Sequence, residues 1–202
     1  RGHAYSRAGV AAFTTSTGYG IAKYDNPEEL SVSDRNNIGY QYTDCPLYWI
    51  SVIYLNFAEA KAEMGSLTQD DLNNSINKLQ ARAGLPAMTT TPDADPANNM
   101  GVSNLIWEIR RCRRCELIMD NWYRYWDLIR WHQLDKLDST KYPNTMLGAN
   151  VSNVPNCEEA TKNGYIDASD AQIRTYEAKH YFYPIPTTQL TLNKNMKQNP
   201  GW

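Results

Sequence analysis

Carboxylates and histidines are the residues of this chain that could do acid–base chemistry. A pair of carboxylates facing each other across a cleft can hydrolyse a glycosidic bond, and a histidine with a suitable partner can act as a general base. In this sequence the carboxylates on predicted helices have basic neighbours, and the histidines are scattered. No G-x-S-x-G, H-E-x-x-H or glycine-rich phosphate loop occurs. We therefore expect no catalysis by Glu59, Glu63, Glu108, Glu116 and Asp127 or by His3, His132 and His180.

The cysteines give no stronger sign of a reactive or metal-binding site. Cys112 and Cys115 form a C-x-x-C within a helical pattern, but no second pair of cysteines or histidines follows at zinc-finger spacing. We expect Cys112 to pack against neighbouring helices. We accordingly assign no metal ligands and expect no cofactor, while the presence of a structural metal and the disulfide state of Cys45, Cys112, Cys115 and Cys157 stay open.

The arginines at positions 110, 111, 113 and 114 could bind nucleic acid if they formed one face. On a helix these side chains spread around more than half of the circumference, and Glu108, Glu116 and Asp120 lie among them. The whole chain has 20 basic and 22 acidic residues, for a formal charge of −2. Nucleic-acid-binding domains are normally basic, so we expect no nucleic-acid partner.

The composition predicts a folded chain with many amphipathic rings. Of its 202 residues 42% are hydrophobic and 21% are charged, which is too apolar for a disordered chain. No apolar stretch approaches the roughly 20 residues of a membrane-spanning helix. The 14 Tyr and 6 Trp greatly outnumber the 3 Phe. Rings with a polar edge suit a protein interface or a sugar-stacking surface, and a tyrosine-rich core would also account for them.

The elements that must position these residues begin after a loop-rich lead-in over residues 1–45. Helices are predicted over 46–64 and 69–83, the second with Thr68 and Asp71 in a capping box. Together they make a helical hairpin of the size of a tetratricopeptide unit. The first helix is apolar on more than one side, and a single repeat cannot bury its own faces. We therefore expect the hairpin to dock on further helices.

Two more helices are predicted over 103–119, with Ser103 as its cap, and over 122–137, which completes a helical core over residues 46–137. Arginine and carboxylate side chains are expected to form an ionic lattice between them; these residues are Glu116, Arg124, Asp127 and Arg130. A loop and tail follow over 138–202. Within them, 181–186 is typical of an edge strand ended by proline, and 198–202 of a turn.

Five short elements follow one another in the order found in a known family. They are YLNFAEA at 54–60, INKLQARAGLP at 76–86, RRCEL at 113–117, RYWDLIRW at 124–131, and the closing YPIP at 183–186 with QNPGW at 198–202. They resemble the Y-L-N-Y-A-E-A, I-N-x-x-R-x-R-A-G-L-P, E-R-R-x-E-L, R-x-x-D-L-x-R-W, P-I-P and Q-N-P-G-Y motifs of the SusD/RagB outer-membrane nutrient-binding lipoproteins of Bacteroidetes-type bacteria. The resemblance is to the C-terminal region of that family.

The resemblance implies a mostly α-helical fold with a tetratricopeptide-like hairpin, further helices, long loops and short β-strands. It also implies that residues 1–202 are a C-terminal region, whose N-terminal half and lipoprotein signal lie upstream. Family members are lipid-anchored at the surface of the outer membrane and cap a SusC-like TonB-dependent transporter. They are not enzymes, and they hold oligosaccharides, or in some members peptides, for import. A carbohydrate-active hydrolase is the alternative from another class.

The resemblance also divides the residues into two groups. The motif residues are expected to be structural; they are Glu59, Arg82, Glu116, Arg124, Asp127 and Arg130. Variable loops with aromatic residues are expected to carry any ligand contacts, because flat rings stack on sugars. The candidates are Tyr5, Arg7, Phe13, Tyr142 and Tyr165. Packing of these rings against other parts of the protein or against the transporter is the competing interpretation.

Overall fold

This computed structural model describes residues 17–19, 23, 29–31, 33–34, 47–120, 122–153, 161–169 and 172–202. The chain divides into two compact units. The helical unit comprises Asp44–Asp127, and the sheet unit comprises Arg1–Thr43 with Leu128–Trp202. The described residues contain six α-helices and one three-stranded sheet, so the fold is mostly helical, as predicted.

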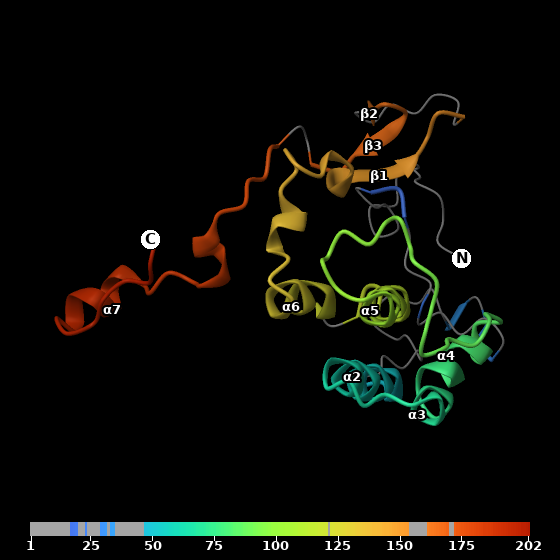
Figure 1. The fold of residues 1–202 in the computed structure, drawn as a ribbon. Coiled ribbons are helices and arrows are strands. Elements are labelled where there is room, and N and C mark those ends of the chain that lie inside the picture. Colours follow the sequence, from blue (N-terminus) through green and yellow to red (C-terminus); the bar gives the residue numbers. More distant parts are fainter. Residues whose placement is uncertain are drawn as a thin grey trace. The chain divides into compact units, whose positions relative to one another are not determined.

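The helical unit begins with α2 (Ile50–Glu63), the longest helix among the described residues. It starts later than the predicted position 46, because Trp49 is still in extended backbone. Leu55 and Ala58 are fully buried on the side that faces α5 (Asn104–Glu116). Figure 1 shows α2 and α5 side by side.

The predicted second helix is divided into α3 (Gln69–Asn73) and α4 (Ile76–Arg82). The capping box at its start is confirmed, because Asp71 N donates to Thr68 Oγ1 at 3.1 Å and Thr68 N donates to Asp71 Oδ2 at 2.9 Å. The break falls at Ser75, whose buried hydroxyl donates to the carbonyl oxygen of Asp71 at 2.5 Å. Such a bond from a side chain to the backbone competes with helical hydrogen bonding, which accounts for the interruption.

The next two helices are shorter than the sequence predicts. Ser103 caps α5, as predicted, by accepting a hydrogen bond from Ile106 N at 3.3 Å. α6 covers only Tyr123–Arg130, and a separate 3-10 turn covers Leu134–Leu137. The predicted single helix over 122–137 is wrong because His132 between them has a φ of 53°, in the left-handed region that an α-helix cannot contain.

The core of the helical unit is a single cluster of apolar side chains from α2 to α5 and the turns that follow α4 and α5. Cys112 packs against this cluster, as predicted. None of the described helices is both long and apolar enough to cross a lipid bilayer. The buried members of the cluster are Val52, Leu55, Ala58, Leu72, Ile76, Leu79, Met88, Ile109 and Leu117.

One side of α2 remains exposed, although the sequence predicts burial on more than one side. Ile50, Ile53, Phe57 and Met64 are between 42% and 76% exposed. Their spacing of three, four and seven residues places them along one helical stripe. The contacts of α2 with α4 and α5 cover its other side, so this unit presents an apolar strip of the kind that a neighbouring helix would bury.

The sheet unit contains a small antiparallel sheet within a region predicted to be loop. β1 (Leu147–Asn150), β2 (Thr161–Lys162) and β3 (Tyr165–Asp167) have the order β1-β3-β2. Asn163 and Gly164, with φ of 55° and 80°, form the two-residue turn between β2 and β3. Asn-Gly is a strong hairpin signal because both positions need positive φ. β2 and β3 are too short to show the alternation of apolar and polar residues by which a strand is predicted.

The closing segments are held together by side chains rather than by a strand. Tyr181 ends a 3-10 turn and residues 182–186 belong to no strand, so the predicted edge strand over 181–186 is wrong. The Gln198 side chain replaces a neighbouring strand: it accepts from Ile185 N at 2.8 Å and donates to Ile185 O at 3.0 Å. Trp202 Nε1 donates to the carbonyl oxygens of Lys179 and Phe182. Residues 199–202 form the predicted turn.

β1 also contacts part of the lead-in. Ala149 N donates to the carbonyl oxygen of Thr17 at 2.8 Å. A Cβ atom on Gly148 would lie 2.3 Å from the same oxygen, so only glycine allows the two backbones to approach this closely.

Gly148→Ala should therefore separate the Thr17 backbone from β1 and destabilise the protein by about 1–3 kcal/mol. Urea unfolding would measure the loss, and faster amide hydrogen exchange at Ala149 would locate it. Thr161→Ala, on exposed β2, is the control. Unchanged exchange at Ala149 would contradict the expected steric conflict.

Candidate ligand-binding site

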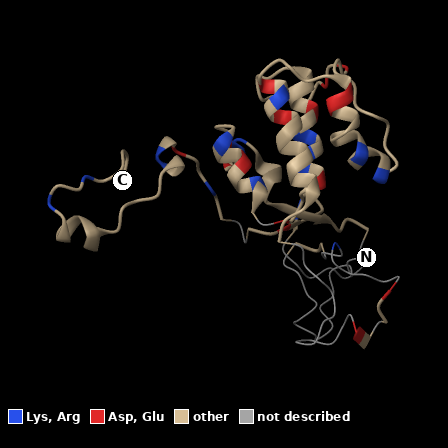
Figure 2. Ribbon diagram, turned by 90° about the horizontal axis from the view of Figure 1, so that it is seen from below, with Lys and Arg blue, Asp and Glu red and all other residues tan. Residues whose placement is uncertain are grey.

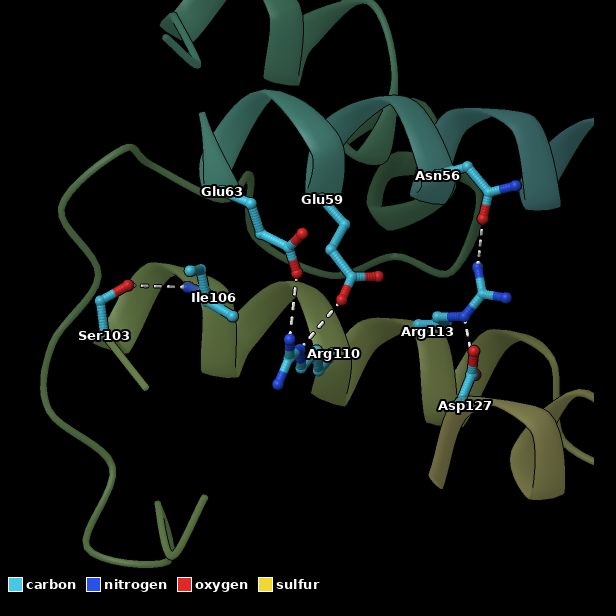
Figure 3. A network of polar contacts seen from close by, with 8 residues as sticks. All are labelled: Asn56, Glu59, Glu63, Ser103, Ile106, Arg110, Arg113 and Asp127. Atoms are coloured by element: carbon cyan, nitrogen blue, oxygen red, sulfur yellow. Dashed lines mark hydrogen bonds and ion pairs between the residues drawn. The ribbon is translucent and has the colours of Figure 1, made fainter. Parts of the chain in front are cut away.

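A buried arginine lies at the centre of the motif segments for which the sequence predicts a structural role. Arg113 on α5 donates from Nε to Asp127 Oδ2 at 2.7 Å and from Nη1 to Asn56 Oδ1 at 2.8 Å. The side chains of Arg113 and Asp127 are 6% and 7% exposed. The guanidinium thus connects α2, α5 and α6 (Figure 3).

A second arginine on α5 connects it to α2 one turn earlier. Arg110 Nε lies 2.9 Å from Glu59 Oε1, and its Nη2 lies 3.1 Å from Glu63 Oε1. Figure 3 shows both carboxylates reaching from α2 to the same guanidinium. Glu59 is buried and neutralised in this way, which matches a positioning role and leaves it engaged with Arg110 rather than facing a cleft.

The other motif residues lie near charged or aromatic side chains. Arg82 Nη2 pairs with Glu116 Oε2 at 2.5 Å, and Ser51 donates to Glu116 Oε1 at 2.9 Å. Burial, followed by the nearby Arg114, lowers the pKa of Arg124. The Arg130 guanidinium lies 5.3 Å from the centre of the Trp131 ring. Both signs of charge occur along the long helices (Figure 2).

Metal and thiol chemistry find no support in the described part of the chain. It contains no group of three or more His, Cys, Asp or Glu side chains placed to hold a metal ion. Burial raises the pKa of the Cys112 thiol to about 11, so at neutral pH it is a protonated, weakly reactive core residue. Cys45 and Cys157 lie outside the described residues.

The candidate site is a pocket of about 200 Å³ in the sheet unit. One part of its wall is apolar, formed by Pro143, Met146, Leu147 and Ile173. The rest is polar, with hydroxyl, amide, ammonium and carboxylate groups from Ser139, Thr140, Lys162, Asp167, Ser169 and Gln172. Small-molecule sites commonly combine apolar walls with a few directed polar groups in this manner.

Asp138 holds two of the pocket's walls together. Its Oδ1 accepts from Thr140 N at 2.9 Å and Thr140 Oγ1 at 2.5 Å, and its Oδ2 accepts from Tyr176 N at 3.1 Å. Next to it, Ser139 N donates to Arg174 O at 2.9 Å and Arg174 N donates to Ser139 Oγ at 3.0 Å. The hydrogen bonds that Asp138 accepts, led by that from the Thr140 hydroxyl, lower its pKa to about 2. The carboxylate therefore fixes Ser139 and Thr140 in place.

The predicted ligand residues Tyr142 and Tyr165 lie next to this pocket but do not line it. Tyr142 precedes Pro143, and its hydroxyl accepts from Lys136 Nζ at 3.0 Å. Tyr165 is partly exposed on β3 and shares a face of the strand with Asp167, because alternate strand residues point the same way. Tyr5, Arg7 and Phe13 lie outside the described residues.

Sequence reasoning missed the polar residues that form the pocket. Asp138, Lys162 and Asp167 lie in a region predicted as loop, and no spacing rule connects them. The available signal was the Asn163–Gly164 turn, which brings Lys162 next to Tyr165 across the hairpin. An Asp followed two residues later by Thr or Ser, as at 138 and 167, also predicts a local side-chain turn.

The sequence model of the SusD family matches residues 3–202. Two solved structures are similar to the chain. A SusD-like protein from Bacteroides fragilis has a TM-score of 0.62 and 23% identity, over 93% of this chain and 31% of its own. BT4246 has a TM-score of 0.64 and 25% identity, over 99% of this chain and 31% of its own. The chain thus spans about a third of the length of these solved relatives. No curated protein is significantly similar in sequence.

Asp127→Ala should destabilise the protein by about 3–5 kcal/mol, because it leaves the Arg113 guanidinium buried without its carboxylate. Arg111→Ala, which breaks the exposed pair of Arg111 with Glu108, should cost less than about 1 kcal/mol. Urea unfolding monitored by circular dichroism compares the two. Equal losses would show that the buried pair has no special role.

We expect the protein to lose stability in acid because of Asp138. Its pKa in the folded protein, about 2, lies below the ordinary value of about 3.9, so its contribution is present above about pH 4 and disappears as pH falls towards 2. Asp138→Asn should flatten the pH dependence in this range and speed amide exchange at Thr140 and Tyr176. Asp93→Asn, at an exposed position, is the control. An unchanged pH profile in the Asp138 variant would contradict this role.

Proposed function

The chain belongs to the SusD family, and on that premise we propose that it is part of a non-catalytic cell-surface protein that binds an oligosaccharide and delivers it to a SusC-like TonB-dependent transporter. The match of the family model over residues 3–202 is the observation that carries the proposal. The fold shared with the SusD-like protein of Bacteroides fragilis supports it.

The chemistry of the sheet unit is compatible with sugar as the ligand. A sugar presents C–H groups on its ring faces and hydroxyls around its edge. The pocket offers apolar wall to the first and polar side chains to the second. Tyr165, at its margin, adds an exposed ring of the type that stacks on a sugar face.

The whole protein would be longer than this chain. The exposed strip of Ile50, Ile53, Phe57 and Met64 on α2 supports the proposal that an N-terminal half supplies further helices to cover it. Residues 1–202 would then be the C-terminal region of a protein that an upstream lipid anchor holds at the outer membrane. Close packing of repeats would bury the strip and stabilise both halves.

A peptide-binding member of the same family is the second candidate, because Lys162 and Asp167 could equally meet the charged ends of a peptide. A carbohydrate-active hydrolase is a weaker third. Its carboxylate pair would have to come from residues such as Glu59, which is committed to Arg110, and the described residues offer no such pair across the pocket.

A glycan array with the whole protein should show retention of at least one oligosaccharide, and a peptide array with the same protein should show no retention. Tyr165→Ala should weaken that binding about tenfold, since a lost ring contact with a sugar costs roughly 1.4 kcal/mol. Tyr183→Ala, another exposed tyrosine of the sheet unit, serves as the control.

Binding and turnover assays with the whole protein separate the alternatives. Release of shortened sugar from a bound oligosaccharide would indicate a hydrolase, and retention of peptides without glycans would select the second candidate. Co-purification with a TonB-dependent transporter from outer membranes would test the partner.

A further inference from the structure

The pocket of the sheet unit is sized for one ring. Its volume of about 200 Å³ lies below the roughly 300–1,000 Å³ of pockets that enclose drug-sized ligands. Pro143, Met146 and Ile173 provide an apolar wall. No aromatic side chain is among the described residues that line it, so recognition inside the pocket depends on hydrogen bonds and shape, and stacking is left to Tyr165 at its margin.

Opposite charges reach the pocket from the β2–β3 hairpin. Lys162 is paired with Tyr165 across the hairpin, and Tyr165 and Asp167 lie on the same face of β3. Ile166 lies between them on the other face and is buried. The hairpin thus turns Lys162 and Asp167 towards one side, and both line the pocket.

The two charged groups differ in how they are held. Asp167 Oδ1 accepts from Ser169 N at 3.0 Å and from Ser169 Oγ at 2.6 Å, which fixes the carboxylate. Lys162 forms no ion pair with a carboxylate in the described ranges. An ammonium offers up to about three donors and a carboxylate about four acceptor positions, so the pair can donate to one hydroxyl and accept from another.

We propose that this pocket captures one neutral pyranose unit of a glycan, at a chain end or a single-unit branch. Lys162 donates to one ring hydroxyl, Asp167 accepts from a neighbouring one, and the apolar wall meets the C–H face of the ring. This proposal rests on the proposed function and identifies the pocket as the place where the glycan binds. Lys162 and Asp167 carry opposite charges and together add no net charge to the pocket, which suits an uncharged ring that both donates and accepts hydrogen bonds.

The test measures binding to the whole protein by isothermal titration calorimetry. The probes are neutral gluco-, manno-, galacto- and xylo-oligosaccharides of two to six units, with galacturonate and chitosan oligosaccharides of equal length. The variants are Lys162→Gln and Asp167→Asn, the second of which can still accept from Ser169. Lys141→Gln, an exposed lysine that does not line the pocket, is the control.

At least one neutral oligosaccharide should bind one per chain, and each variant should weaken it about tenfold or more, as loss of a charge-assisted hydrogen bond implies. Lys141→Gln should leave it unchanged, and Lys162→Arg should restore most of the loss. Hydrogen exchange at Ala149 and Ile166 would verify that the sheet remains folded in each variant.

Other results would overturn the inference in distinguishable ways. Neutral glycan binding that neither variant affects would place the site elsewhere and leave the proposed function intact. Tighter binding of the galacturonate oligosaccharides than of the neutral ones would contradict a preference for neutral sugars. Failure of every glycan to bind, both here and on the array with the whole protein, would overturn the proposed function as well.

Discussion

The burial of one guanidinium is the constraint on which the helical unit depends. A cation shielded from water is tolerated only when its donors have partners. Arg113 finds a carboxylate on α6 in Asp127 and an amide on α2 in Asn56, while itself belonging to α5. The three helices must therefore pack at the one height along their axes, and turned in the one direction, that brings these side chains together. Arg110 repeats the arrangement one turn away with Glu59. Apolar packing supplies most of the driving force for folding, and these directional contacts select which packing is adopted.

The sheet unit is held together differently, because its described residues form little regular structure and many of their backbone groups need partners outside helices and strands. Side chains provide them. Asp138 organises one bend of the chain and Asp167 another, each by accepting from a residue two positions later. Gln198 bonds to both backbone groups of Ile185 as a paired strand would. Irregular backbone held in this way can present polar groups at angles that a helix or a large sheet does not offer, which suits a ligand pocket.

Scaffold and pocket are separate in the sequence. The motif segments place arginines and carboxylates where helices touch, so these charged side chains stabilise the packing of the helices. All the pocket-lining residues lie between 139 and 173, outside every one of those segments. With such a division, substitutions in the pocket would leave the ion pairs of Arg113 undisturbed. It also explains why reactive residue types on the helices gave no catalytic pattern.

The family, the predominance of helices, the capping of α3 and α5 by Thr68 and Ser103, and the packing of Cys112 could all be predicted from the amino-acid sequence, because they depend on local chemistry or on ordered motifs. The partners of the charges could not be predicted, because they depend on the packing of distant helices: Asp127 pairs with Arg113, which the predicted lattice did not include. The small sheet and the pocket could not be predicted either. Strands of two to four residues carry too little periodicity to be read, and a pocket depends on which distant segments fold side by side.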